Sequence, residues 1–255
     1  MKLAIFDLDH TLLAGDSDYA WGNFLVDEGV VDADFYRQKN DEFYQQYQAK
    51  TLDIFAYQAF VLAPLTTLSL SERSRLHDKF MATVIMPLRQ DKADQLIAQH
   101  QADGDTLLVI TATNRFIAEP IVKMMGIPHL LATDPEVIGD TSKSTLTATF
   151  TGKIAGTPCF QEGKITRLKQ WLAEQQDQHQ HVFTHTTFYS DSINDAPLLE
   201  YVDTAIAVDP DEKLSLLADE KQWPIISLKK NFDVDILFLF PITFILITLL
   251  FFFDL

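Results

Sequence analysis

The amino-terminal stretch MKLAIFDLDHTLL, residues 1–13, is the starting point for interpreting the whole chain. Its apolar run Leu3 to Phe6 is typical of a buried strand, and it leads directly into Asp7, Asp9 and Thr11. Side chains two residues apart on an extended segment point the same way, so the two carboxylates are expected to meet at the strand's end. Two like charges at that distance repel unless a positive group lies between them.

Similar apolar, β-branched runs recur along the chain, and helical patterns separate the later ones. Strands that alternate with helices predict parallel pairing and an α/β layer fold. In such sheets ligands bind beyond the carboxyl ends of the strands, and we expect Asp7, Thr111 and Asp191 at such ends. The runs are LAIFDL (3–8), DTLLVIT (105–111), HLLAT (129–133), HTTFYS (185–190) and TAIAVDP (204–210).

Residues 13–88 carry no comparable strand pattern, and their aromatic residues recur at helical spacing. We interpret this stretch as an inserted helical cap on an α/β core formed by residues 1–12 and 89–228. The alternating run STLTATFTGKI, residues 144–154, predicts a β-hairpin over the sheet edge.

The composition argues against some classes of function and indicates a cellular compartment. The net charge of −16 over 255 residues argues against a nucleic-acid partner, because phosphate backbones are bound by a surplus of Lys and Arg. The single Cys159 allows no internal disulfide, which indicates a reducing compartment. The amino terminus lacks the pattern of a signal peptide, so we expect a cytoplasmic protein. The sequence carries no signal for oligomeric state.

The carboxyl-terminal segment 229–255 differs from the rest. Residues 236–253 are uncharged and reach the lower length limit for crossing a bilayer, and Lys229 and Lys230 precede them. Three interpretations stay open: an anchor to the cytoplasmic face of a membrane, an apolar tail packed on the domain or on a partner, and an appended segment without function.

Four segments occur in an order that makes chemical sense. They are FDLDHT (6–11), Thr111 at the end of DTLLVIT, Lys164 in CFQEGKITRLKQWL (159–172), and Asp191 with Asp195 in YSDSINDAPLL (189–199). Together they resemble the motif set of the haloacid dehalogenase superfamily of phosphohydrolases, over residues 1 to about 228.

The helical insertion after the first motif resembles the phosphoserine phosphatase-like branch of that superfamily. The strings FDLDHTLLAGDSDYAW, TATNRFIAEPI and YSDSINDAPLL resemble a bacterial subgroup that includes histidinol-phosphate phosphatases. Two features depart from the pattern: the apolar tail, and Ser190 where the superfamily more often has Gly.

The resemblance implies a Rossmann-like core with an inserted helical cap, and a Mg²⁺-dependent phosphomonoesterase. Mg²⁺ would be held by the Asp7 carboxylate, the main-chain carbonyl of Asp9 and the Asp191 carboxylate. Asp7 would form an aspartyl-phosphate intermediate, while Asp9 acts as general acid and base. Thr111 and Lys164 would bind the phosphoryl group, and Asp195 would orient Lys164 or a metal-bound water.

Simpler structural interpretations stay open at this point. Asp7 and Asp9 could flank a turn, and Asp191 or Asp195 could begin a helix. Lys164 could be a solvated lysine in the first turn of a helix. Thr113, two residues after Thr111, is interpreted as an ordinary strand residue.

Asp16 is the main candidate for substrate selection. By resemblance it lies where phosphoserine phosphatases carry the acid that meets the substrate's ammonium group, although a helix N-cap explains it equally well. Ser17 and Asn114 are further candidates for contact with the substrate. The stretch YQAFVLAPL, residues 57–65, lacks the arginine that a substrate carboxylate would need, with Arg37, Arg73 and Arg75 as substitutes from elsewhere in the cap.

An amine without a carboxylate favours histidinol phosphate, whose imidazole could rest on Trp21 or Tyr57. The small phosphate ester could instead be phosphoserine. The sequence is also compatible with a membrane-tethered phosphatase for a lipid head group, and with a catalytically silent binding domain.

Overall fold

The computed structural model describes residues 1–139 and 148–229. Among them a six-stranded parallel sheet has the order β3-β2-β1-β6-β7-β8. This confirms the α/β fold with a Rossmann-like parallel sheet. The strands are β1 (Lys2–Phe6), β2 (Thr106–Asn114), β3 (His129–Thr133), β6 (His185–Ser190), β7 (Thr204–Val208) and β8 (Ile225–Ile226).

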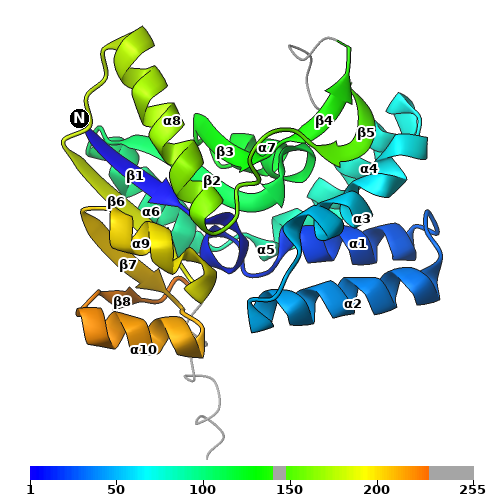
Figure 1. Ribbon diagram of the computed structural model, residues 1–255, viewed down its shortest axis with the longest axis horizontal. Coiled ribbons are helices and arrows are strands. Elements are labelled where there is room, and N and C mark those ends of the chain that lie inside the picture. Colours follow the sequence, from blue (N-terminus) through cyan, green and yellow to red (C-terminus); the bar gives the residue numbers. More distant parts are fainter. Residues whose placement is uncertain (140–147, 230–255) are drawn as a thin grey trace, which may run out of the picture.

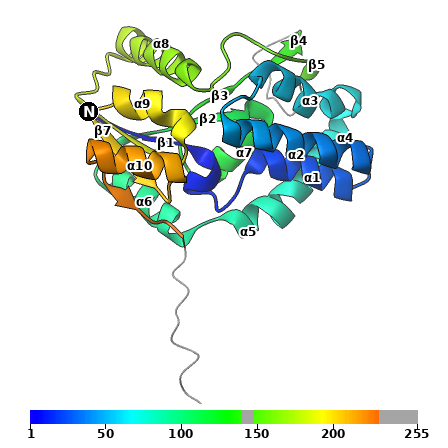
Figure 2. The ribbon, with the colours of Figure 1, turned by 60° about the horizontal axis from the view of Figure 1, so that its bottom comes forward.

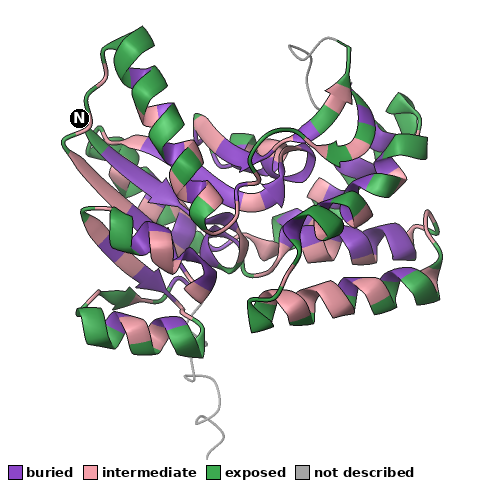
Figure 3. Ribbon diagram, in the orientation of Figure 1, coloured by how far each residue is buried: buried purple, intermediate pink, exposed green. Residues whose placement is uncertain are grey.

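Helices cover both faces of the sheet (Figures 1 and 2). Successive residues of the central strand point to opposite faces and are apolar on both, so each face needs a cover. Leu3 and Ile5 of β1 face α8 (Glu162–His179), α9 (Ala196–Tyr201) and α10 (Glu212–Lys221). Ala4 and Phe6 face α6 (Asp91–Ala102) and α7 (Arg115–Met124). The buried residues of Figure 3 are accordingly concentrated in the strands between these helices.

Between β1 and α6 the chain forms a series of helices that we call the helical segment, residues 17–88. It lies beside the sheet rather than on one of its faces (Figure 1). The turn η1 (Leu8–Leu12) precedes it, with His10 in the left-handed region at φ 56°. Its elements are α1 (Ser17–Asp27), α2 (Ala33–Ala49), α3 (Ile54–Thr67), α4 (Leu70–Phe80), η2 (Met81–Ile85) and α5 (Met86–Leu88).

A two-stranded antiparallel sheet packs against α3. Its strands are β4 (Pro135–Ile138) and β5 (Thr149–Ile154). Of the hairpin expected from 144–154, residues 144–147 lie outside the described residues. The remainder forms β5, which includes Gly152 and pairs with β4, a strand that lies before the predicted run.

Among residues 1–139 and 148–229, no helix combines the length and the apolar character needed to span a bilayer. The proposed anchor at 236–253 lies outside these residues.

Candidate active site

Three neighbouring strands bring the motif residues to one edge of the sheet. Asp7 follows β1, and its main-chain N–H still donates to the carbonyl of Tyr189 in β6 at 2.9 Å. Thr111 lies inside β2 rather than at its end, because β2 extends past β1: Phe6 pairs with Val109, and β2 continues to Asn114. The parallel register thus places Thr111 level with the residues that follow β1.

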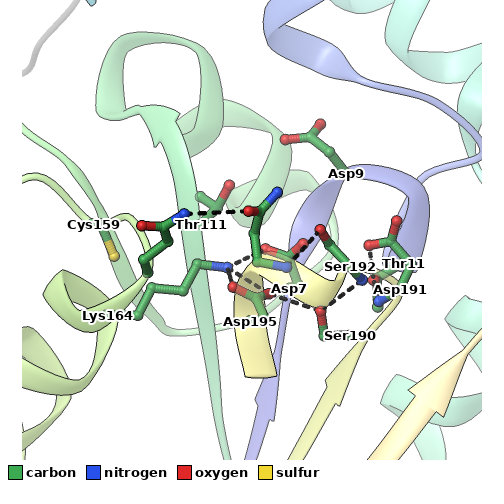
Figure 4. A network of polar contacts seen from close by, with 12 residues as sticks. Asp7, Asp9, Thr11, Thr111, Cys159, Lys164, Ser190, Asp191, Ser192 and Asp195 are labelled. Carbon is green, nitrogen blue, oxygen red and sulfur yellow. Dashed lines mark hydrogen bonds and ion pairs between the residues drawn. The ribbon is translucent and has the colours of Figure 1, made fainter. Parts of the chain in front are cut away.

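Lys164 is the charged centre of the site (Figure 4). Its Nζ lies 2.9 Å from Oδ1 of Asp7 and 2.7 Å from Oδ1 of Asp195, and its side chain is 4% exposed. Burial favours the neutral amine, but the charges of Asp195 and Asp7 outweigh this effect and raise the pKa of Lys164 above its usual range. Lys164 is therefore an ammonium group, and the interpretation as a solvated lysine is wrong.

The start of α8 positions Lys164. Gly163 packs so closely that a Cβ there would lie 2.1 Å from the carbonyl oxygen of Pro158. Only glycine tolerates this approach, and it directs the next residue inward from the first turn of the helix. The sequence shows Gly163 but not what it faces.

Asp195, the second carboxylate that contacts Lys164, is itself held by Ser190. Ser190 Oγ donates to Oδ2 of Asp195 at 2.7 Å and accepts the main-chain N–H of Ser192 at 3.2 Å. Asp195 stands before α9, but its side chain makes no capping hydrogen bond to that helix. The serine that replaces the more common glycine thus takes part in holding Asp195, a role that the sequence did not reveal.

Asp191 is held by Thr11. Thr11 Oγ1 donates to Oδ1 of Asp191 at 3.0 Å and accepts the main-chain N–H of Asp191 at 3.1 Å (Figure 4). Burial raises the pKa of Asp191 well above its usual value, and the charges of Asp7 and Asp195 raise it further. The ends of β1 and β6 therefore bring carboxylates distant in the sequence into electrostatic contact.

The donor set at this edge fits a hard cation. Burial raises the pKa of Asp7 to about 7, with Lys164 opposing the shift and the charges of Asp195 and Asp9 adding to it. Asp7 and Asp195 contact the ammonium group of Lys164, whereas Asp191 is held by Thr11. Among the described residues no three His, Cys, Asp or Glu side chains group as a metal site. The set implied by the resemblance has only two carboxylates, with a carbonyl oxygen as third ligand, and oxygen ligands of this kind suit Mg²⁺.

Asp9 points away from Lys164 and is held separately (Figure 4). Its Oδ1 accepts the main-chain N–H of Ser17 at 2.6 Å, and its Oδ2 accepts the hydroxyl of Thr113 at 2.7 Å. Thr113 lies inside β2, as expected for a strand residue, and its hydroxyl also contacts Asp9. The signal available for this contact was its spacing from Thr111, because residues two apart in a strand share a face.

A cavity leads from these residues into the helical segment. At one end it is lined by Asp7, Asp9, Thr111, Thr113, Lys164, Asn194 and Asp195. At the other it is lined by Asp16, Asp18, Tyr19, Asn40, Phe43, Tyr44, Tyr47, Ile54 and Tyr57 of α1 to α3 and their flanks, with Phe160 opposite. We call these the catalytic end and the helical end.

Asp16 caps a helix and also lies at the cavity. Its Oδ1 caps α1 by accepting the main-chain N–H groups of Asp18 at 2.9 Å and Tyr19 at 2.8 Å, and the residue also lines the cavity. Burial and the charge of Asp9 raise the pKa of Asp16 to about 7, while the two capping hydrogen bonds oppose the shift.

Ser17 and Asn114 lie behind the cavity wall. Ser17 reaches Asp9 through its main-chain N–H, and its side chain is fully buried. Asn114 Nδ2 donates to Oδ1 of Asp18 at 3.3 Å, while its own Oδ1 accepts the N–H of Ile117 at the start of α7. Neither residue is among those that line the cavity.

The two aromatic residues considered for contact with a substrate ring lie in different places. Tyr57 lines the cavity, whereas Trp21 is fully buried against Phe80 and Phe116 in the hydrophobic core. The sequence did not single out Phe43, Tyr44, Tyr47 or Phe160 as cavity residues. Helical spacing marks them as apolar but does not distinguish a core face from a cavity face.

The three arginines considered for a substrate carboxylate lie elsewhere. Arg37 and Arg75 pair with acids on the surface of the helical segment, Asp27 and Glu28. Arg73 is buried and donates to the main-chain carbonyl of Ala148 at 2.6 Å. Of the described residues that line the cavity, Lys164 is the only Lys or Arg.

Comparison with known proteins places these observations in a family. Residues 4–200 match the model of the haloacid dehalogenase-like hydrolases. A histidinol-phosphatase from Neisseria meningitidis is 44% identical over 228 residues, which cover 89% of this chain and 99% of that protein.

Two solved structures share the fold. A protein of unknown function from Bordetella pertussis has a TM-score of 0.79 at 39% identity, covering 89% of this chain and 99% of that one. A phosphoserine phosphatase described as a phospho-aspartyl intermediate analogue has a TM-score of 0.60 at 15% identity, covering 90% and 94%. At that identity the second likeness concerns the fold alone.

Proposed function

We propose that this chain, which belongs to the haloacid dehalogenase-like hydrolases, is a Mg²⁺-dependent phosphatase for a small amine-bearing phosphate monoester, with histidinol phosphate as the best candidate. The observation that carries the proposal is the contact of one buried ammonium group, Lys164, with both Asp7 and Asp195 at the catalytic end of the cavity. Residues 1–12 and 89–228 would form the catalytic core, 13–88 the cap, and 229–255 a separate tail.

Asp7 is the nucleophile of the proposed reaction. Its carboxylate attacks phosphorus, the ester P–O bond breaks, and an aspartyl phosphate forms, so one difficult displacement becomes two easier ones. Mg²⁺ held by Asp7, Asp191 and the Asp9 carbonyl would offset the negative charge of the phosphoryl group. Lys164 offsets charge from the opposite side, and the hydroxyl of Thr111 at the cavity wall donates to a phosphoryl oxygen.

Asp9 is the general acid and base. It donates a proton to the departing alkoxide in the first step and accepts one from the attacking water in the second. The hydrogen bonds from Ser17 and Thr113 support this role because they hold the carboxylate in one orientation at the cavity. Asp195 orients Lys164, and Ser190 in turn orients Asp195.

The lining of the cavity supports an amine-bearing substrate. Asp16 offers a carboxylate for an ammonium group, and the absence of Arg from the described lining residues argues against a substrate carboxylate. This favours histidinol phosphate over phosphoserine. The histidinol-phosphatase relative, aligned over nearly its full length, supports the same choice.

The test is the rate of phosphate release, with Mg²⁺, from histidinol phosphate, phosphoserine, glycerol phosphate and p-nitrophenyl phosphate. We expect the highest kcat/KM for histidinol phosphate. A preference for phosphoserine would favour a phosphoserine phosphatase instead, and a preference for glycerol phosphate would remove the argument from Asp16. If none of the four is hydrolysed, the catalytically silent binding domain replaces the enzyme.

The proposed location is the cytoplasm. A phosphatase for lipid head groups stays a second candidate through residues 236–253. Fractionation of the full chain beside a variant that ends at residue 229 tests it: membrane recovery of the full chain alone would support the anchor, and equal recovery with the cytosol would argue against it.

A further inference from the structure

The helical end of the cavity contains a second acid that the proposed reaction does not use. Asp18 is 4% exposed and lines the cavity beside Tyr57 of α3. Its Oδ1 accepts a hydrogen bond from Asn114 Nδ2 at 3.3 Å. The side chains of Tyr57 and Gln58 also hydrogen-bond the Asp18 carboxylate. These partners are all neutral, and no Lys or Arg among the described residues lines this end of the cavity. A carboxylate buried in this way is costly, because burial removes the water that would otherwise solvate its charge.

One buried acceptor next to Asp18 lacks a donor. Gln58 is fully buried, and its Oε1 has no hydrogen-bond partner among the described residues. Its Nε2 donates to the carbonyl of Ala112, which lines the cavity, and its side chain also hydrogen-bonds Asp18. Buried polar atoms are nearly always paired in native proteins, so this acceptor, beside a carboxylate with only neutral partners, indicates a ligand that brings N–H groups.

Asp16 and Asp18 flank Ser17 at the start of α1, and both line the cavity. Asp16 caps α1 through its side chain. Asp18 instead contacts Tyr57 and Gln58 of α3 and Asn114 at the end of β2. Burial raises the pKa of Asp18 well above its usual value, and the charges of Asp16 and Asp9 raise it further. A substrate with its phosphate at Asp7 can therefore meet both acids in the same cavity, with Asp18 on the side of α3.

Resting on the proposed phosphatase function, we propose that Asp18 is a specificity-determining residue that accepts an N–H from a second basic group of the substrate, an imidazole ring. The substrate class is a phosphate ester in which phosphate, primary amine and imidazole follow one another along a short chain. The amine meets Asp16, and the ring lies by Tyr57 and Phe43, whose side chains line the same end of the cavity. Aromatic walls suit a flat ring, and Asp18 supplies the acceptor that distinguishes imidazole from phenyl.

The first test uses the unaltered protein and two substrates of similar shape. Histidinol phosphate is compared with phenylalaninol phosphate, which keeps the phosphate and the amine but replaces imidazole with phenyl. We expect kcat/KM to be at least about tenfold higher for histidinol phosphate, as is typical of one buried hydrogen bond to a charged group. Equal values for the two esters would overturn the proposal for Asp18.

The second test is Asp18→Asn, which keeps the shape and removes the charge. It should lower kcat/KM for histidinol phosphate about tenfold more than for phenylalaninol phosphate. The matched control is Asp27→Asn on the same helix α1, whose side chain is 72% exposed on the surface and which should leave both values unchanged. An equal loss with both esters would show that Asp18 only supports the fold, and that outcome would overturn the proposal.

The two proposals fail separately. If the unaltered protein hydrolyses neither ester, nor p-nitrophenyl phosphate, the phosphatase function itself is wrong. If it hydrolyses both aminoalkyl esters at the same rate, the phosphatase function stands and the role of Asp18 is wrong. The comparison of substrates requires no variant, so it remains decisive even where Asp18→Asn does not fold.

Discussion

The two ends of the cavity differ in how their negative charge is balanced. At the catalytic end Lys164 contacts both Asp7 and Asp195 directly, so the protein provides its own cation. At the helical end Asp16 and Asp18 line the same cavity, and no Lys or Arg among the described residues lines that end. In the proposed function, the first end would carry out a reaction common to many phosphate esters, whereas the second would receive a positively charged group of the substrate.

The elements behind the two ends explain this difference. Parallel strands deliver their carboxyl ends to one edge, so residues from β1, β2 and β6 meet at the catalytic end. Helices α1 to α3 deliver mainly aromatic side chains and the two acids at the start of α1. In the proposed function, catalysis and substrate selection therefore depend on different parts of the chain, and variants can separate them.

The largest effect is expected for Asp7→Asn at the catalytic end. Loss of the nucleophile should lower kcat for every substrate by at least about 10⁴-fold, in the range seen when a nucleophile is removed. The fold should remain, because Asn removes a buried charge without changing the volume of the side chain. Phosphate release measures the first result and thermal unfolding the second. Retained turnover in a folded variant would contradict the covalent mechanism.

Lys164→Met tests the internal charge balance at the same end. It leaves Asp7 and Asp195 buried without their cation, so the free energy of unfolding should fall by about 3–5 kcal/mol. Lys169→Met on the same helix is the matched control, because Lys169 is exposed and its ammonium lies over the ring of Tyr201. Urea unfolding of both variants gives the comparison, and equal stabilities would show that the buried contact contributes nothing.

The pH dependence of stability in Asp16→Asn tests the buried acid at the helical end. The pKa of Asp16 is raised to about 7 in the folded protein, above its ordinary value of 3.8, so folding takes up a proton between these values. This contribution to stability is present below about pH 4 and is lost as the pH rises through about 7. Asn cannot ionise, yet it still caps a helix. The Tm of the variant minus that of the unaltered protein should therefore increase from pH 5 to pH 8. A difference in Tm that stays constant over this range would contradict the raised pKa of Asp16.

Tyr47→Phe tests the connection between the two ends and should have the smallest effect. Tyr47 OH of α2 donates to Ser192 Oγ at 3.1 Å, and Asn194 Nδ2 donates to the carbonyl of Tyr47 at 3.3 Å. The variant loses only the first bond, so it should lower the free energy of unfolding by about 0.5–1.5 kcal/mol. Tyr201→Phe, at an exposed tyrosine, is the control. Equal unfolding midpoints for the two variants would show that this link is weak.

Much of the core was predictable because its signals are local. Five of the six strands of the parallel sheet coincide with the apolar runs read from the sequence. The exception, β8, is only Ile225–Ile226, too short to show a period. The strand that pairs with β5 is Pro135–Ile138, which lies before the run 144–154 from which a hairpin was expected, because alternation in one strand does not identify its partner.

The candidate site likewise has features that the sequence predicted and features that it did not. The convergence of Asp7, Lys164 and Asp195 was expected because their motifs resemble those of the haloacid dehalogenase superfamily. The contact of Thr113 with Asp9 depends on the register of β2 against β1, which no single segment reveals. Trp21 entered the core whereas Tyr57 entered the cavity, because most faces of a packed helical segment are apolar.

By itself, the sequence determined which segments become strands, which residue types stand at their ends, and hence the chemistry available there. These properties depend on backbone periodicity and on neighbours in the chain. Only the tertiary structure decided which acids contact a cation among the described residues, that Ser190 holds Asp195, and which aromatic side chains face the cavity. Those outcomes depend on burial and on contacts between residues far apart in the chain, where the loss of solvent turns small differences in position into large differences in energy.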